Sequence, residues 1–305
     1  MPAKTVSAFP DLTLGTVQLG LPYGKISASE PADAATASRF LQAAWDGGVR
    51  CLDTAGNYGT SERLIGSWLK DRTSRPAIVS KLPAYPADAT PDPAGFVEQY
   101  MAQSLSDLGV ESLDAYLMHR PSDIRIDGLV DAMAQTVRKG QARAWGLSIY
   151  TEEEFRIALT LPGLSVLQAP VSIFDTRLIR SGALDAATRA GATVFARSVF
   201  LQGAMFIDPD KVPADLSGLE PALRQLRALS QSHDIPPGAL ALKTVMSLNT
   251  VASTVVGTAT LPQLKEIIAW SRINIPDDAL QSALLIGDKV HADLVDPRNW
   301  PTSVS

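Results

Sequence analysis

Short apolar segments alternate with longer segments along most of the chain. The short segments are continuous apolar runs bounded by Gly, Pro or polar residues, a pattern typical of buried strands. One of them, residues 49–53, directly follows two glycines. The pattern predicts strands at residues 12–19, 49–53, 77–81, 113–118, 142–148, 165–168, 192–197 and 251–256.

The longer segments carry apolar residues at every third or fourth position, which is the spacing of an amphipathic helix. Several of them stop at a glycine, such as Gly109 or Gly140, as helices commonly do. Tails are expected at residues 1–11 and 293–305, and a Pro-rich loop at 83–93. We predict helices at residues 31–46, 61–71, 94–108, 127–139, 151–160, 178–190, 217–233, 237–248, 261–270 and 277–292.

Repeated strand-then-helix units favour an α/β fold, because parallel strands need crossover connections of about a dozen residues or more. Eight units without a break in composition predict one closed (β/α)8 TIM barrel. We expect a single domain over residues 1–305, with the barrel core at 12–270 and a C-terminal helix and tail at 271–305. The alternative is a doubly wound sheet, but GTVQLG at residues 15–20 does not match its Gly-x-Gly-x-x-Gly turn.

The composition narrows the classes of function. Of 305 residues, 46% are hydrophobic, so the chain can bury a large core. The formal net charge is -5 and the charges are dispersed, which argues against a nucleic-acid partner. No apolar run is long enough to span a bilayer, and the first residues lack the apolar core of a signal peptide.

Cys51 is the single cysteine of the sequence, so an intrachain disulfide is excluded. This suits a reducing compartment, and we expect a cytoplasmic protein without a membrane partner. The sequence has no P-loop, no nucleophile elbow and no zinc-ligand spacing, so we expect no metal. The pattern indicates no particular oligomeric state.

Four residues suited to acid–base chemistry follow three successive predicted strands. Asp53 and Tyr58 follow the second strand, Lys81 the third and His119 the fourth. The carboxyl ends of barrel strands meet at one rim, where enzymes of this fold carry out their chemistry. Singly, the four have structural explanations: a loop cap, a half-buried aromatic, a strand-end lysine and a core histidine. Together they predict an active site.

The segment LDTAGNYGTSE, residues 52–62, resembles the second-strand signature of the aldo-keto reductase family. Lys81 and His119 fall where that family has its lysine and histidine, and the resemblance covers most of the chain. It implies that a nicotinamide cofactor delivers a hydride to a carbonyl carbon while Tyr58, as general acid, protonates the oxygen.

The resemblance also implies a role for each neighbour of Tyr58. Lys81 would lower the pKa of the phenol from its ordinary value of about 10. Asp53 would keep the buried ammonium charged and in place. His119 would donate a hydrogen bond to the carbonyl oxygen and orient it.

Later segments resemble the family's cofactor contacts. Ser148 and Gln168 match the pair that holds the nicotinamide amide. Arg197 stands where the family has a tyrosine stacked on the nicotinamide, and the backbone amides of residues 198–203 are expected to cradle phosphate. The resemblance implies cofactor contacts at Thr16, Asp53, Ser148, Gln168, Arg197, Ser198, Phe200, Gln202, Gly203, Gly257, Thr258, Thr260, Gln263 and Glu266.

Several positions depart from the family pattern. Ile149 replaces an asparagine beside the nicotinamide amide, and Ile267 replaces one that contacts adenine. Ala259 replaces the Arg or Lys that pairs with the 2′-phosphate of NADP, although Thr258, Thr260 and the start of the next helix can bind phosphate. We therefore expect NADPH as cofactor, with NADH also accepted and a weaker NADPH preference than the family norm.

The substrate pocket is expected to contain Tyr23, Tyr58, His119 and Trp300, with packing of the tail as the alternative explanation for Trp300. Apolar walls with few polar groups suit an aldehyde, a ketone, a sugar or pyridoxal. We therefore expect a small-molecule carbonyl or sugar as the partner.

Two other functions stay open at this point. The family includes regulatory subunits that hold the nucleotide, catalyse weakly and sense a partner. A barrel lyase or isomerase would instead use Lys81 to form a Schiff base.

Overall fold

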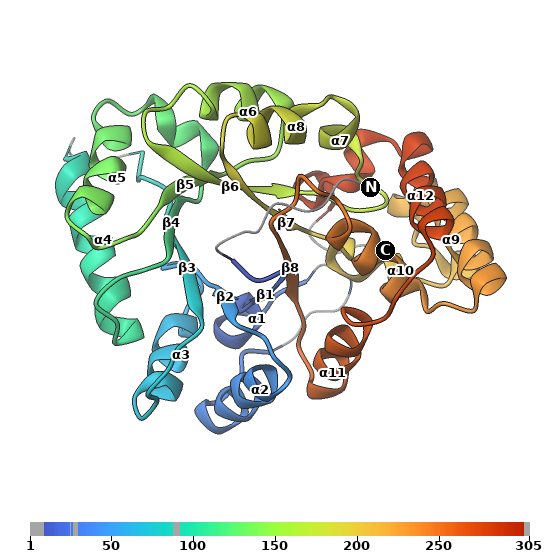
Figure 1. Cartoon of the computed structure of the whole chain (residues 1–305), viewed down its shortest axis with the longest axis horizontal. Coiled ribbons are helices and arrows are strands. Elements are labelled where there is room, and N and C mark those ends of the chain that lie inside the picture. Colours follow the sequence, from blue (N-terminus) through green and yellow to red (C-terminus); the bar gives the residue numbers. More distant parts are fainter. Residues whose placement is uncertain (1–8, 25, 27–29, 88–91, 302–305) are drawn as a thin grey trace.

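The computed structural model describes residues 9–24, 26, 30–87 and 92–301. In these residues, eight parallel strands close into a barrel in sequence order, and the last strand pairs with the first (Figure 1). The predicted (β/α)8 barrel is confirmed. The strands are β1 (Leu12–Gly15), β2 (Cys51–Asp53), β3 (Ala77–Leu82), β4 (Ala115–Met118), β5 (Trp145–Ser148), β6 (Leu164–Pro170), β7 (Thr193–Arg197) and β8 (Ser253–Gly257).

Helices follow the strands and surround the barrel (Figure 1). No helix of the described ranges has both the length and the apolar character needed to cross a membrane. The α-helices are α1 (Val17–Gly20), α2 (Ala34–Asp46), α3 (Ser61–Leu69), α4 (Pro93–Leu108), α5 (Leu129–Arg138), α6 (Glu152–Ala158), α7 (Arg177–Arg180), α8 (Ala183–Arg189), α9 (Glu220–His233), α10 (Pro237–Met246), α11 (Leu261–Trp270) and α12 (Asp277–Leu285). The 3-10 turns are η1 (Pro121–Arg125), η2 (Leu201–Phe206), η3 (Pro209–Lys211), η4 (Ala214–Leu219), η5 (Ile286–Lys289), η6 (Ala292–Val295) and η7 (Pro297–Asn299).

The strands send alternate side chains to the two faces of the barrel wall. On β3, Ile78 packs in the layer between strands and helices, whereas Val79 belongs to the core inside the barrel. Lys81 is two residues further along and points to the same inner face. The ring of Phe9 meets Phe195 edge-on, 4.9 Å between ring centres, and closes the amino end of this inner core. Polar side chains are therefore left at the carboxyl end.

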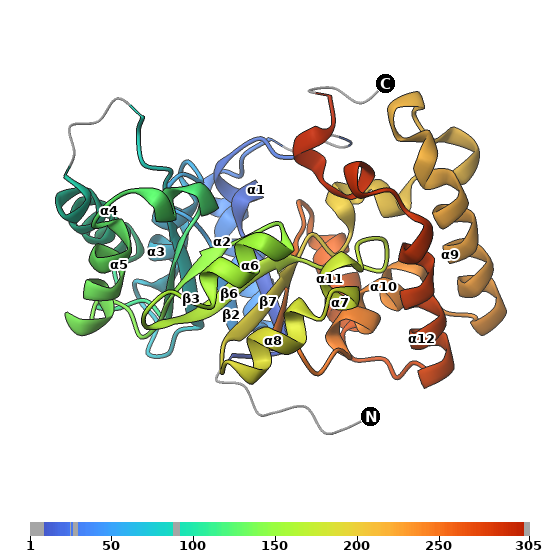
Figure 2. The same ribbon diagram turned by 90° about the horizontal axis from the view of Figure 1, so that it is seen from above.

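A second core lies beside the barrel, where α9, α10 and α12 pack side by side (Figure 1, Figure 2). It contains Leu223 of α9, Leu240 of α10, Ala283 of α12 and Trp300, which follows η7. The predicted C-terminal helix is thus present, and it is held against the helices that precede β8.

The first predicted strand is too long. β1 ends at Gly15 and residues 17–20 form α1, although the apolar run predicts a strand to residue 19. The backbone N–H of Thr16 donates to the Asp53 carbonyl oxygen (2.9 Å), and the chain turns directly afterwards. A short apolar run does not distinguish a buried strand from a helical turn, which explains the error.

Two predicted helices are interrupted. Gly182, with φ 73°, separates α7 from α8 within the predicted helix at 178–190. α12 ends at Leu285, and the 3-10 turns η5 and η6 replace the rest of the predicted helix at 277–292. Apolar spacing continues through each break because both parts face a core, so the pattern does not mark the interruption.

Candidate active site

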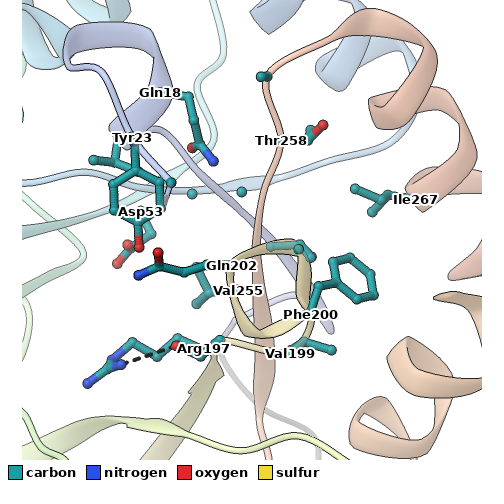
Figure 3. Close-up of a pocket in the computed structure, with 18 of the residues that line it drawn as sticks. Gln18, Tyr23, Asp53, Arg197, Val199, Phe200, Gln202, Val255, Thr258 and Ile267 are labelled. Carbon is teal, nitrogen blue, oxygen red and sulfur yellow. Dashed lines mark hydrogen bonds between the residues drawn. The ribbon is translucent and has the colours of Figure 1, made fainter. Parts of the chain in front are cut away.

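A cavity of about 830 Å³ opens at the carboxyl end of the barrel. Its wall comes from residues at or after seven of the strand ends, and Figure 3 shows Asp53, Arg197, Gln202 and Thr258 around it. All predicted site residues line it except Lys81 and Trp300. The predicted residues in its lining are Thr16, Tyr23, Asp53, Tyr58, His119, Ser148, Gln168, Arg197, Ser198, Phe200, Gln202, Gly203, Gly257, Thr258, Thr260, Gln263 and Glu266.

Trp300 lies in the second core and not in the cavity wall. Its side chain is 5% exposed, and its indole N–H donates to the Leu294 carbonyl oxygen (3.0 Å). The expectation that Trp300 lines the substrate pocket is therefore corrected, and the structure agrees with the alternative that it packs the tail.

Lys81 and Asp53 form a buried ion pair behind the cavity. The ammonium Nζ donates to Asp53 Oδ2 (2.7 Å) and to the Thr54 carbonyl oxygen (3.0 Å). The second carboxylate oxygen of Asp53 accepts from the Gln168 amide (2.7 Å). Burial lowers the pKa of Lys81, and the Asp53 charge opposes that shift. The predicted role of Asp53, to hold Lys81 in place, matches this geometry.

Tyr58 lines the cavity beside this pair. Lys81 Nζ is 5.2 Å from the centre of the Tyr58 ring, and the hydroxyl has no hydrogen-bond partner in the described part of the chain. Burial, followed by the charge of Asp53, raises the pKa of Tyr58, while Arg197 opposes the shift. The pKa of Tyr58 is therefore raised and not lowered as expected, because burial is the largest influence on it.

His119 lines the cavity next to Tyr58. Its ring meets that of Tyr58 edge-on, with 5.7 Å between the ring centres. Burial, assisted by the charges of Lys81 and Arg197, lowers the pKa of His119 to about 3. The imidazole is therefore neutral near pH 7, and one of its nitrogens carries the only ring proton.

Ser148 and Gln168 end two neighbouring strands. They are register partners between β5 and β6, and both line the cavity. The next residue, Ile149, is fully buried in the layer between strands and helices, so its side chain faces away from the cavity. Its carbonyl oxygen accepts from Arg197 Nη2 (3.1 Å). At the position where the family has an asparagine side chain, this chain therefore contributes a backbone carbonyl oxygen, which binds Arg197.

Arg197 ends β7 with its guanidinium over the Tyr150 ring, 4.2 Å from the ring centre. The guanidinium of Arg298 also lies over this ring at 3.4 Å, and it is paired with the Asp296 carboxylate. Arg197 Nη1 donates to Ser198 Oγ (3.3 Å). These contacts fix Arg197 at the cavity wall and connect it to the C-terminal segment.

The loop after β7 bends sharply along the cavity. Ser198, Leu201 and Gln202 have positive φ values of 62°, 47° and 50°, which are uncommon for residues other than glycine. Figure 3 shows Phe200 and Gln202 of this loop along the wall. The tight bend brings backbone to the cavity, as a phosphate-binding loop requires.

The residues after β8 form the opposite end of the cavity. Thr258 donates to the side-chain oxygen of Gln263 (2.8 Å), and Thr260 accepts from the backbone N–H of Gln263 as the cap of α11. Gly257 lies against Gln18, whose Oε1 is buried without a hydrogen-bond partner in the described residues.

Sequence reasoning missed several lining residues, among them Gln18, Tyr150, Phe206 and Trp270. Phe206 and Trp270 are nearly parallel, 6.3 Å between ring centres, and Phe200 contacts both. The aromatic residues follow helical spacing or stand in irregular segments, so the pattern alone assigns them to a core.

A sequence model of the aldo/keto reductase family matches residues 11–283. Aldo-keto reductase str7 of Strobilurus tenacellus is 27% identical over 300 residues, which cover 91% of this chain and 88% of that protein. D-threo-aldose 1-dehydrogenase of Pseudomonas sp is 23% identical over 309 residues, 88% of this chain and 91% of its own length.

A solved structure has the same fold. The holo form of an aldo-keto reductase from Bacillus halodurans superimposes with a TM-score of 0.75 at 21% identity, covering 92% of both chains. With the family match over residues 11–283, the resemblance seen in the second-strand segment is confirmed. The chain belongs to the aldo/keto reductase family.

Proposed function

We propose that the protein is an oxidoreductase that transfers a hydride between NADPH and the carbonyl of a small aldehyde, ketone or sugar. The observation that carries this proposal is the contact between Tyr58 and His119 in the cavity lining, next to the buried pair of Lys81 and Asp53. One relative is named as a dehydrogenase of an aldose, which supports a sugar or an aldehyde as substrate.

The rim has groups that fit a nicotinamide dinucleotide, which supplies the hydride when bound. Ser148 and Gln168 offer hydrogen bonds to a carboxamide, and the Gln168 carbonyl oxygen is left to accept because its amide nitrogen donates to Asp53. Arg197 adds a positive charge to the cavity wall.

Tyr58 is the proton donor in this proposal. Its raised pKa keeps the phenol neutral near pH 7, and its hydroxyl is available to a substrate oxygen. Reduction of a carbonyl leaves negative charge on that oxygen, and Tyr58 Oη gives it the proton. The Lys81 ammonium, 5.2 Å from the ring centre, then stabilises the phenolate, while Asp53 and Gln168 keep Lys81 in position.

NADPH is proposed with a weak preference over NADH. Ala259 offers no cation to the 2′-phosphate, and it lines both the large cavity and a smaller one of about 210 Å³. Glu30 and Asp33 also line the smaller cavity, and their negative charges oppose a phosphate dianion. Thr258 and the amino end of α11, by contrast, favour a phosphate group at this place.

The first experiment measures NADPH oxidation by the wild type with a panel of aldehydes, sugars and quinones. Tyr58→Phe removes the proton donor and keeps the ring, so turnover should fall by about 10²- to 10⁴-fold. NADPH binding, followed by fluorescence titration, should stay within about twofold of the wild type because the phenol is not needed to hold the dinucleotide.

Tyr100→Phe is the matched control, because Tyr100 lies on α4, away from the cavity lining. It should leave turnover unchanged. Full turnover in Tyr58→Phe would refute the role assigned to this residue. A wild type that binds NADPH but turns over no carbonyl would support the regulatory-subunit alternative instead.

A further inference from the structure

Arg197 brings a positive charge to the cavity that no carboxylate of the described residues balances. A guanidinium has five N–H donors. Nη1 donates to Ser198 Oγ and Nη2 to the Ile149 carbonyl oxygen, so the other three donors have no partner in the described part of the chain. Arg298, which lies over the same tyrosine ring, is by contrast paired with the Asp296 carboxylate.

The other titratable groups of the cavity lining leave this charge in place. Asp53 is already paired with Lys81. Burial is the main cause that lowers the pKa of His119 to about 3, so this ring is neutral near pH 7. Glu266 lies on α11, after β8. Arg197 is only half-buried, but a cation in the wall of a cavity attracts an anion more strongly than one in open water.

The Arg197 side chain extends along the rim of the barrel towards β5. It starts at the end of β7, yet it contacts Ile149 and Tyr150, which follow β5, so it passes the end of β6 (Figure 3 shows it along the cavity wall). His119 lies on that side, because it follows β4, the other neighbour of β5. Thr258 and the amino end of α11, which favour phosphate, follow β8 on the opposite side of β7.

The guanidinium is held in place beside the reacting groups. It lies over the Tyr150 ring at 4.2 Å, and the guanidinium of Arg298 lies over the same ring at 3.4 Å. Burial is the largest influence on the pKa of Tyr58 and of His119, and the charge of Arg197 acts on both. A fixed cation loses little conformational freedom when an anion binds to it, so Arg197 is prepared for a ligand near Tyr58.

We propose that Arg197 binds a carboxylate of the substrate, so that the protein acts on carbonyl compounds that carry an acid group, such as aldehyde acids and keto acids. This inference rests on the proposed function: Tyr58 protonates the carbonyl oxygen, and Arg197 holds the acid group of the same molecule. It replaces the cofactor contact that the resemblance implies for Arg197. A guanidinium suits a carboxylate because two parallel N–H donors can meet its two oxygens.

The test compares aldehydes of nearly equal shape and different charge, 3- and 4-carboxybenzaldehyde with 3- and 4-nitrobenzaldehyde. At each ring position, kcat/KM for the carboxy compound is divided by kcat/KM for the nitro compound, and the position with the larger wild-type ratio is used further. The intrinsic reactivity of the aldehydes cancels when proteins are compared. In Arg197→Gln the ratio should fall about 10- to 100-fold, because a charge-assisted hydrogen bond is lost. Arg197→Lys keeps the charge without the fork, and its ratio should lie between the two.

Arg63→Gln is the matched control, since Arg63 lies on α3 with its side chain 60% exposed and outside the cavity lining. Its ratio should stay within about twofold of the wild type, because salt screens distant surface charges. An equal fall in both glutamine variants, or an unchanged ratio in Arg197→Gln, would overturn the inference. If the ratio is unchanged and NADPH affinity, followed by fluorescence titration, falls about tenfold or more, Arg197 binds a phosphate of the cofactor instead.

Calorimetry separates this inference from the proposed function. With saturating NADP present, the wild type should bind the alcohol of the chosen carboxybenzaldehyde at least about tenfold more tightly than the matching nitrobenzyl alcohol, and Arg197→Gln should lose this difference. Equal binding of the two alcohols by the wild type, or binding of neither, would refute the carboxylate site. If no aldehyde is reduced, the proposed function fails, while calorimetry still decides whether Arg197 binds the acid group.

Discussion

Ala259 is exposed at the end of the cavity that follows β8, with a short side chain and acidic neighbours. A phosphate group there meets the hydroxyl of Thr258 and the start of α11, but no guanidinium or ammonium from this position. Charge-assisted hydrogen bonds to phosphate are roughly twice as strong as neutral ones. Under the proposed function, the preference between NADPH and NADH therefore depends largely on this residue.

Ala259→Arg should raise the ratio of kcat/KM for NADPH to that for NADH by about 10- to 100-fold, because an arginine fork binds phosphate in two places. The wild-type ratio should be below about a thousandfold. Ala259→Gln, which adds length without charge, is the control and should leave the ratio near that of the wild type. An equal ratio in the arginine variant would show that the 2′-phosphate binds elsewhere.

At the residue scale, the sequence identifies which side chains lie together in the site, but it does not give the direction of their pKa shifts. Asp53, Tyr58, Lys81 and His119 follow strand ends, and parallel pairing brings strand ends together. The direction of the pKa shift of Tyr58 depends on burial and on the nearby charges of Asp53 and Arg197, which the order of residues does not contain. The contact between Asn57 and His119 is likewise a matter of side-chain orientation.

At the scale of elements, α1 and the loop after β2 are packed without a gap. A Cβ at Gly20, the last residue of α1, would overlap the backbone carbonyl oxygen of Tyr58 and crowd the amide of Ser61. Backbone atoms cannot move aside as the end of a flexible side chain can, so a methyl group there displaces the loop that carries Tyr58.

Gly20→Ala should lower the free energy of unfolding by about 1–3 kcal/mol, measured by urea denaturation, because overpacking forces the backbone to shift. Turnover should fall by roughly tenfold or more, since a small misplacement of a reacting group slows catalysis strongly. Gly56→Ala is the stability control, because its Cβ would have Pro83 at 3.5 Å as nearest neighbour, an ordinary contact. Equal stability of both variants would contradict the close packing.

The elements themselves could largely be predicted from the sequence, and their boundaries less well. Strands and helices follow from runs of apolar residues and from their spacing, and all eight predicted strands overlap observed ones. The ends of β1 and α12 depend on where backbone hydrogen bonds change partner. Apolar residues continue past both ends, so the pattern contains no sign of the change.

At the scale of the whole molecule, the second core joins the C-terminal segment to α9 and α10. Trp300 is 5% exposed within it, and removal of so large a buried side chain leaves a cavity. Trp300→Ala should reduce the free energy of unfolding by about 3 kcal/mol. The KM values for cofactor and substrate should stay within about twofold, because Trp300 does not line the active-site cavity.

Leu285→Ala at the end of α12 is the comparison for Trp300→Ala, because Leu285 is 65% exposed. Its effect on unfolding should stay within about 0.5 kcal/mol. If Trp300→Ala instead raises the KM for substrate strongly and loses little stability, Trp300 contacts the substrate and this prediction is wrong.

The pairing of β1 with β8 has a consequence for protein synthesis. The residues around the cavity extend from Gly15 to Trp270, so the ring of strands can be joined only after the ribosome has released the chain through β8. A nascent chain that lacks β8 has an incomplete cavity and cannot bind a dinucleotide there. Binding of the coenzyme by the newly made protein should therefore begin only when β1 and β8 pair, and the time at which binding begins reports the closure of the barrel.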